Sequence, residues 1–165
     1  MKVLNFGSLN IDYVYQMAHF IRPGETAPCK TLTAGCGGKG LNQSIALAKA
    51  GTEVYHAGLY GGEAQFLLDK MQTAGVDTSL LRLGEGANGH AIIQVDENGQ
   101  NCIILYGGTN RQITEAMSTR SLPTSKRAMC SFCRTKLTAC PISCKKRTRR
   151  AFASPSTPRP TGRRF

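Results

Sequence analysis

Short apolar runs mark the strands in the first two thirds of the chain. Runs rich in β-branched, aromatic and other apolar residues predict strands at residues 2–6, 13–15, 31–34 and 54–59. Residues 7–12 are polar and follow the first run, so they predict a loop at the end of that strand. Residues 22–25, with the sequence Arg-Pro-Gly-Glu, predict a turn.

Helical spacing of apolar residues predicts two helices. The first spans residues 41–50, where Leu41, Ile45 and Ala48 share one face, and Gly51 supplies a C-terminal stop. The second spans residues 63–74 and is amphipathic. Its residues at helical spacing are Phe66, Leu67, Lys70, Met71 and Ala74.

Two more β-rich runs, at residues 88–96 and 101–106, are joined by Glu-Asn-Gly-Gln, and Asn-Gly is a strong hairpin signal. Strands therefore alternate with helices, with the hairpin as a late addition. The sequence predicts an α/β fold.

Glycines and short polar residues indicate a binding site near the first helix. Gly37, Gly38 and Gly40 precede the helix, and a glycine-rich backbone at a helix start lets oxygen-rich ligands approach free N–H groups. Asn10, Asp12 and, one turn into the helix, Asn42 offer groups suited to sugar hydroxyls. Asn-x-Asp in a loop is also ordinary turn chemistry.

The sequence context excludes two nucleotide-binding motifs, the dinucleotide-binding G-x-G-x-x-G motif and the P-loop. Gly35, Gly37 and Gly40 match G-x-G-x-x-G, but the motif follows a second short strand, and Glu53 lies too near it to bind a ribose hydroxyl. No Gly-Lys-Ser/Thr occurs, so the segment is not a P-loop.

Taken together, the motifs resemble the start of the ribokinase-like (PfkB) sugar kinases. They are Gly-Ser-Leu-Asn-Ile-Asp at residues 7–12, Pro-Gly-Glu-Thr at 23–26, Gly-Gly-Lys-Gly-Leu-Asn-Gln at 37–43, Ala-Gly-Val-Asp-Thr at 74–78 and Gly-Gly-Thr-Asn at 107–110. Their order and spacing match over residues 1–114, which we assign to the N-terminal part of such a kinase domain.

The resemblance implies a fold, a reaction and a site. The fold would be a ribokinase-like three-layer α/β sandwich, here incomplete, with a small β-sheet lid built from residues 13–21, 31–34, 88–96 and 101–106. The reaction would be ATP-dependent phosphorylation of a sugar, with ribose to ribose 5-phosphate expected first and Mg²⁺ as the usual metal. Sugar-binding roles fall on Asn10, Asp12, Gly38, Lys39, Gly40 and Asn42, and a hinge falls on Gly37 and Gly38.

The sequence departs from the family pattern in two ways, one with an expected effect on structure and the other on catalysis. At Tyr60-Gly61-Gly62 the family usually has an acidic residue, and we expect a structural effect there. The family's catalytic aspartate lies in a Gly-Ala-Gly-Asp motif that these 165 residues do not contain. No catalytic residue is therefore assigned, and we expect this chain to be a truncated, inactive fragment that keeps the sugar-binding half.

Charge divides the chain at residue 115. The net charge is +11, yet residues 1–114 carry 8 Lys+Arg and 9 Asp+Glu, whereas residues 115–165 carry 13 Lys+Arg and 1 Glu. The second segment resembles a disordered basic interaction tail, and a non-catalytic nucleic-acid-binding protein is the alternative function. Cys130, Cys133, Cys140 and Cys144 are weak candidates for zinc ligands.

A frameshift explains more of the basic segment than a functional tail does, and we favour it. Suppose that the reading frame slips after Ala116. The first base of each present codon then becomes the middle base of a codon in the original frame, and the middle base decides whether the encoded residue is apolar or polar. The codons of Cys130, Ser131, Phe132 and Cys133 can all begin with T, so in that frame each can encode an aliphatic residue or Phe. This interpretation argues against a nucleic-acid partner, because the positive charge is then a by-product of the frameshift.

The remaining sequence features point to a cytoplasmic protein that forms no membrane contact. No apolar run is long enough to cross a bilayer, and the first residues form no secretory apolar region. We expect Cys29, Cys36 and Cys102 to be reduced and mostly buried. His19, His56 and His90 are isolated in sequence and are interpreted as structural or surface residues. The resemblance also allows a homodimer through the lid strands.

Overall fold

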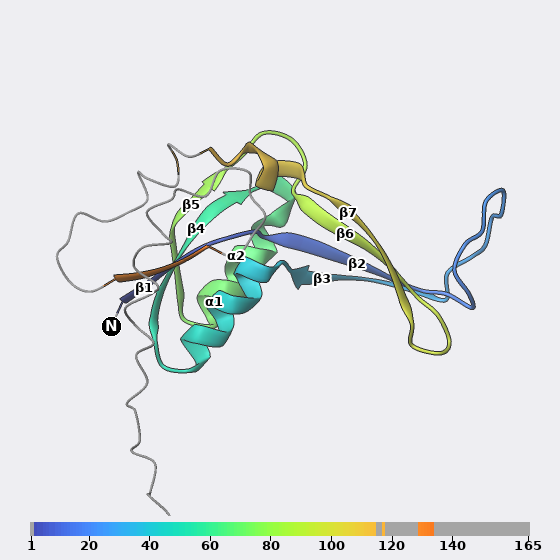
Figure 1. Cartoon of the computed structure of the whole chain (residues 1–165), viewed down its shortest axis with the longest axis horizontal. Helices are drawn as coiled ribbons and strands as arrows, with labels where there is room; N and C mark the ends of the chain where they lie inside the picture. Colours follow the sequence, from blue (N-terminus) through green and yellow to red (C-terminus); the bar gives the residue numbers. More distant parts are fainter. Residues whose placement is uncertain (1, 115–116, 118–128, 134–165) are drawn as a thin grey trace, which may run out of the picture.

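The computed structural model describes residues 2–114, 117 and 129–133, which form two four-stranded sheets, two α-helices and two 3₁₀ turns (Figure 1). The first sheet contains β1 (Lys2–Phe6), β4 (Glu53–Tyr60), β5 (Val76–Leu83) and β8 (Met129–Cys133). The second contains β2 (Asn10–Gln16), β3 (Thr31–Gly37), β6 (Gly89–Val95) and β7 (Asn101–Tyr106). The helices are α1 (Lys39–Lys49) and α2 (Gln65–Thr73), and the 3₁₀ turns are η1 (Gly62–Ala64) and η2 (Gly108–Gln112).

The first sheet is parallel throughout, in the order β5-β4-β1-β8. Helix α1 lies between β3 and β4 along the chain and packs on β4 and β1, while α2 connects β4 to β5 and packs on β5. This arrangement confirms the predicted α/β class. Strand β5 was not predicted, and β8 lies in the segment that the sequence analysis separated as a basic tail.

Alternating residues of β1 and β4 bury both faces of this sheet, as parallel sheets require. On the helix side, Val54 joins Leu41, Leu67 and Met71 in one core cluster. On the other side, Leu4 and Phe6 join Ala57, Leu59 and Ile113 in a second cluster. The two clusters hold the sheet between two apolar layers.

The second sheet mixes pairing types, in the order β3-β2-β6-β7. Strand β2 pairs antiparallel with β3 and parallel with β6, and β6 pairs antiparallel with β7. Figure 1 shows this sheet projecting away from the helices, with the β6–β7 hairpin at its far end. In that hairpin the Asp96 carboxylate accepts hydrogen bonds from the amides of Asn98 and Gln100, and Gly99 has φ +75°. The predicted hairpin is confirmed.

Several predicted boundaries were wrong for a common reason. Asn10 and Asp12 lie in strand β2 rather than in a loop, and β3 continues through Gly37. Ladder pairing on both sides of β2 outweighs the turn preference of these short polar residues. Helix α1 begins at Lys39, two residues before the predicted start, because Gly38, with φ +98°, turns the chain directly after β3.

In α2 the buried residues are Leu67, Leu68 and Met71, whereas Phe66 is exposed. The prediction that the three cysteines are mostly buried was wrong. Cys29 and Cys102 are free and exposed, and Cys36 is half-buried.

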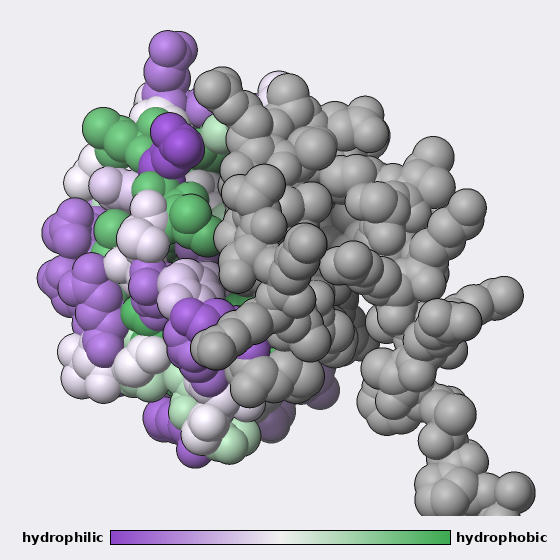
Figure 2. All heavy atoms as spheres, turned by 90° about the vertical axis from the view of Figure 1, so that its left-hand side faces the viewer, coloured by the Kyte–Doolittle hydropathy of each residue, from purple (hydrophilic) through white to green (hydrophobic). Residues whose placement is uncertain are grey.

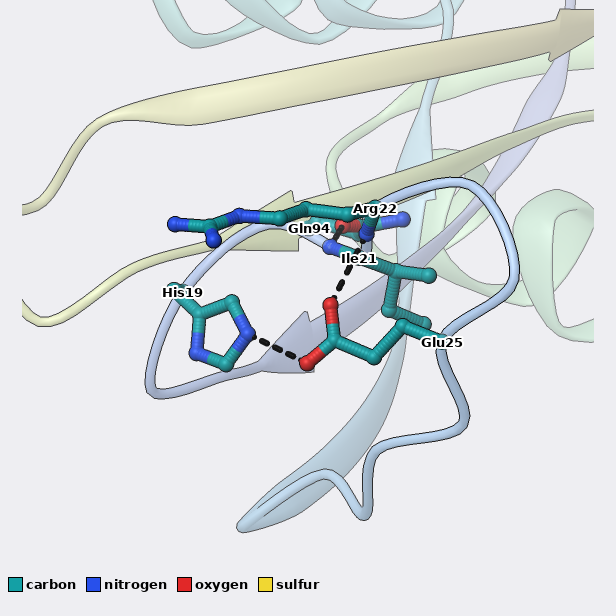
Figure 3. Close-up of polar contacts among 5 residues, drawn as sticks. All are labelled: His19, Ile21, Arg22, Glu25 and Gln94. Carbon is teal, nitrogen blue, oxygen red and sulfur yellow. Dashed lines mark hydrogen bonds and ion pairs between the residues drawn. The ribbon is translucent and has the colours of Figure 1, made fainter.

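The loop between β2 and β3 is organised by Glu25 (Figure 3). Its carboxylate bonds to His19 Nε2 at 2.6 Å and accepts the Arg22 amide at 3.0 Å. The Ile21 amide donates to Gln94 Oε1 of β6 at 3.1 Å, which attaches the loop to the sheet. The Arg22 amide and the His19 ring also lower the pKa of Glu25. The predicted turn at residues 22–25 is confirmed by the hydrogen bond from the Glu25 amide to the Arg22 carbonyl.

The surface at the β1 end of the molecule is mixed in polarity: Figure 2 shows hydrophobic residues there in small groups separated by hydrophilic ones. In the part of the chain that the structure describes, no helix has both the length and the apolar character needed to span a membrane.

Candidate functional site

The end of β1 and the start of α1 touch through their backbones. A Cβ on Gly7 would lie 2.7 Å from Gly40 Cα, and a Cβ on Gly40 would lie 2.6 Å from the Gly7 carbonyl carbon. The Leu41 amide donates to the Ser8 carbonyl at 3.2 Å. Only glycine permits this approach, which places the first turn of α1 directly over the loop that follows β1.

Gly38 makes the corner between β3 and α1. It has φ +98°, and a Cβ there would lie 2.7 Å from the Ser8 carbonyl oxygen and 2.9 Å from the Asn10 nitrogen. No side chain caps the helix N-terminus, and its first turn holds no acidic residue. This helix start is therefore electrostatically suited to an electron-rich ligand group.

The Asp12 carboxylate lies against the backbone of Gly37. A Cβ built on Gly37 would be 2.2 Å from the Asp12 carboxyl atoms, so glycine is needed to leave space for that side chain. Burial raises the pKa of Asp12. The structure thus brings a partly buried carboxylate next to the corner that begins α1.

Lys39 and Asn42 are exposed on the first turn of α1, where the Asn42 amide donates to the Gly38 carbonyl at 3.0 Å. The described contacts join Gly38 to the backbone of Asn10 and Gly37 to Asp12. They do not join the side chains of Lys39 or Asn42 to either residue.

The face of the second sheet that carries Asp12 is otherwise largely apolar, as the strand register shows. Residues paired across neighbouring strands point to the same side, and Asp12 is paired with Ala91, which is paired with Leu105. Two residues further along, Val14 is paired with Ile93. The carboxylate is thus bordered by aliphatic side chains, an arrangement suited to a molecule with hydroxyls on one side and C–H groups on the other.

Comparison with known proteins gives a family. The model of the pfkB family carbohydrate kinases matches residues 1–150. The chain belongs to the pfkB family of carbohydrate kinases.

Two curated relatives and two solved structures represent this similarity. The ribokinase of Staphylococcus aureus (strain COL) is 37% identical over 117 residues, which are 68% of this chain and 38% of that protein. The ribokinase of Haemophilus influenzae is 30% identical over 118 residues, 70% of this chain and 39% of that protein. Ribokinase from Cryptococcus neoformans in complex with ADP has a TM-score of 0.65 at 35% identity, covering 78% of this chain and 38% of that one. Arabidopsis thaliana ribokinase complexed with ribose and ATP has a TM-score of 0.60 at 30% identity, covering 66% and 36%.

These matches define the fold as ribokinase-like: part of a three-layer α/β sandwich with a small β-sheet lid, as predicted. The chain spans about two fifths of the length of the curated relatives it matches. The family match also reaches beyond residue 114, into the segment predicted to be a tail.

Buried asparagines that the sequence analysis did not assign connect the lid to this site. Asn110, in η2, donates to Asn10 Oδ1 at 2.9 Å and to the Leu9 carbonyl, and accepts the Leu9 amide at 3.1 Å. Asn88 donates to the same Leu9 carbonyl and accepts the Gly61 amide. Asn110 belongs to the Gly-Gly-Thr-Asn motif at residues 107–110, whereas a lone Asn88 gives no sequence signal.

The departure at Tyr60-Gly61-Gly62 is followed directly by an acidic residue that has a structural contact. The Glu63 carboxylate accepts the Asn88 amide at 2.6 Å. The contact joins η1, which follows β4, to the residue before β6. It supplies an acidic group next to the position where the sequence lacked one.

The histidines occupy three different environments, as the sequence analysis expected of structural or surface residues. His56 is fully buried, and His19 is paired with Glu25 at the surface. His90 lies between two aromatic rings on the lid face opposite Asp12, with ring centroids 5.8 Å from Tyr13 and 4.9 Å from Tyr106. Within the described residues, no group of three or more His, Cys, Asp and Glu side chains could hold a metal ion. Cys130 and Cys133 lie in β8, and Cys140 and Cys144 lie outside the described residues.

Replacing Gly37 tests the space that Asp12 requires. Gly37→Ala places a methyl group on the Asp12 carboxylate and should lower the free energy of unfolding by about 1–3 kcal/mol, the usual cost of overpacking. Gly35→Ala is the matched control in the same strand, because a Cβ there would lie 3.9 Å from the nearest atom, the Asp12 carbonyl oxygen. Urea denaturation of both variants measures the difference, and equal stabilities would contradict the packing described here.

Proposed function

We propose that this chain is the sugar-binding part of an ATP-dependent sugar kinase of the cytoplasm, with ribose as its first candidate substrate. The observation that carries the proposal is the Asp12 carboxylate, held against Gly37 beside the uncapped start of α1. A carboxylate next to helix N–H groups can accept hydrogen bonds from one sugar hydroxyl and leave N–H donors for another. In this proposal Asn10, Lys39 and Asn42 add polar contacts, while Gly38 and Gly40 let the backbone approach the sugar.

Closure of the lid over the sugar belongs to the same proposal. Gly37 and Gly38 join β3 of the lid to α1, and Gly38 has a backbone conformation that other residues rarely adopt. These two glycines are proposed as the hinge. A closed lid would place Ala91, Ile93 and Leu105 over the sugar and exclude water.

We further propose that the chain as given binds sugar without phosphorylating it. Phosphoryl transfer depends on positioning and on stabilisation of charge, and the Gly-Ala-Gly-Asp motif that carries the family's catalytic aspartate is absent from this sequence. The described residues form no metal cluster. We therefore assign neither ATP nor Mg²⁺ to a site on this chain.

Asp12→Ala tests the sugar site. Loss of charge-assisted hydrogen bonds worth about 1.5–3 kcal/mol should weaken ribose binding by about 10-fold to 100-fold, measured by isothermal titration calorimetry on the full chain. Asp69→Ala, an exposed carboxylate on α2, is the control and should bind ribose like the unchanged protein. Equal affinities of the two variants would contradict the role of Asp12, and ATP-dependent phosphorylation of ribose by the unchanged chain would contradict its inactivity.

A homodimer through the lid strands is proposed from the exposed face of β7. Ile104 and Tyr106 are 59% and 52% exposed and lie on the face opposite Asp12. A second lid could cover these residues. Ile104→Lys should then convert the dimer to a monomer in sedimentation velocity, whereas Phe66→Lys, at an exposed apolar position on α2, should leave the mass unchanged. A monomeric unchanged protein would contradict the proposal.

The origin of residues 115–165 is proposed to be a frameshift. The supporting observation is the abrupt change to 13 Lys+Arg and 1 Glu after a balanced first segment. Strand β8 and the family match through residue 150 favour the alternative, in which residues 115–165 are a genuine part of the protein.

Sequencing the coding DNA across codons 112–120 and beyond codon 165 decides between these alternatives. One restored base that opens a frame carrying Gly-Ala-Gly-Asp is the expected result. An unchanged sequence without such a frame would overturn the frameshift and leave the basic segment as a genuine part of the protein.

A further inference from the structure

A buried polar chain runs beneath the candidate sugar site, through three elements. Asn5 of β1, Ser44 of α1 and His56 of β4 each have 0% exposure. Asn5 Nδ2 lies 2.8 Å from both the Gly40 carbonyl oxygen and Ser44 Oγ. Ser44 Oγ lies 2.6 Å from His56 Nδ1, and His56 Nε2 lies 3.2 Å from the Gly7 carbonyl oxygen.

The chemistry of these groups fixes the direction of every hydrogen bond. The Gly7 carbonyl can only accept, so His56 Nε2 carries the proton in this contact. Burial lowers the pKa of His56 to about 4, so the ring is neutral at pH 7 and Nδ1 accepts from Ser44. Asn5 donates in turn to Ser44 Oγ. Asn5 therefore donates to Ser44, Ser44 donates to His56, and His56 donates to the Gly7 carbonyl.

Both ends of this chain bind the two glycines whose backbones touch. Asn5 holds the Gly40 carbonyl, and His56 holds the Gly7 carbonyl. Those carbonyls belong to the loop after β1 and the first turn of α1, the two segments that border the candidate sugar site. A change in these hydrogen bonds would therefore directly alter the distance between the loop after β1 and the first turn of α1.

Stability alone does not explain a polar chain at this position. Asn5 Oδ1 is buried and has no hydrogen-bond partner among the described residues, and an unpaired buried oxygen costs free energy. Apolar side chains would avoid that cost between a parallel sheet and a helix. What the polar chain provides, and apolar packing does not, is a directional link between two backbone carbonyls.

We propose that Asn5, Ser44 and His56 are positioning residues that set the Gly7–Gly40 contact and, through it, the orientation of the Gly38–Gly40 backbone toward the sugar. This inference rests on the proposed sugar-binding function. None of the three side chains is itself placed in contact with the sugar.

His56→Phe tests the proposal, because it keeps a planar ring of similar size and removes both ring nitrogens. The variant should fold at pH 7 but show displaced amide NMR signals for Gly38, Lys39 and Gly40. Both ring hydrogen bonds are lost in this variant. Its ribose affinity should therefore fall by at least about fivefold, the change that corresponds to one hydrogen bond of about 1 kcal/mol. Ser79→Ala, an exposed serine on β5, is the control and should change neither readout. A folded His56→Phe variant with unchanged amide signals and unchanged affinity would overturn the proposal.

A measurement on the unchanged protein covers the case in which the variant fails to fold. Nitrogen-15 NMR of the histidine rings at pH 7 should show His56 protonated at Nε2 and unprotonated at Nδ1, and ribose should shift its Nε2 signal although the ring lies beneath the site. The other tautomer, or a signal that saturating ribose does not move, would overturn the proposal. If the unchanged protein binds no ribose, the proposed function fails separately. The tautomer and the amide signals of the variant then decide whether the chain positions the glycines.

Discussion

The close backbone contact between Gly7 and Gly40 is the constraint on which the rest of the structure depends. With less than 3 Å available for a Cβ on either residue, the helix start and the loop after β1 can approach only as bare backbone. This contact fixes the height of α1 above the sheet and brings the Gly38 corner onto Ser8 and Asn10. The candidate site exists because two chain segments, separated by more than thirty residues, have no side chains where they cross.

The second sheet continues that arrangement. Asp12 is held by ladder pairing on both sides of β2 and by the bare backbone of Gly37, so its carboxylate is placed by strands and not by a loop. Groups on paired strands keep their positions more accurately than groups on loops. Asn110 of η2 adds a hydrogen bond to Asn10, two residues before Asp12 in the same strand. A lid that moves about Gly37 and Gly38 would carry Asp12 with it as part of a rigid sheet.

Local signals predicted much of this fold, and long-range pairing decided the rest. Strand β1, helix α1 and the Asn-Gly hairpin have strong patterns of their own, and each is confirmed. Strand β5 lacks a continuous apolar run and alternates only weakly, so its pairing with β4 is what makes it a strand. Asn10 and Asp12 were identified through the family resemblance, because Asn-x-Asp alone indicates a turn. No local pattern could have grouped Asn5, Ser44 and His56, which meet only after α1 packs on the sheet.

The arrangement also explains why sugar recognition and phosphoryl transfer can be separate properties of such a fold. Every residue that we propose to bind the sugar lies between Asn10 and Asn42. The contacts that position these residues come from β1, α1, β4 and the lid, all within residues 2–114. These contacts lie within the two sheets and helix α1, so their geometry needs no phosphate donor to form. Phosphoryl transfer makes a different demand, because charge that develops on the transferred group must be stabilised where that group moves. Glycine contacts and neutral amides can orient a hydroxyl with precision. Glycine contacts and neutral amides contribute little to stabilising that charge. A unit built mainly from such groups is suited to holding one reactant in place.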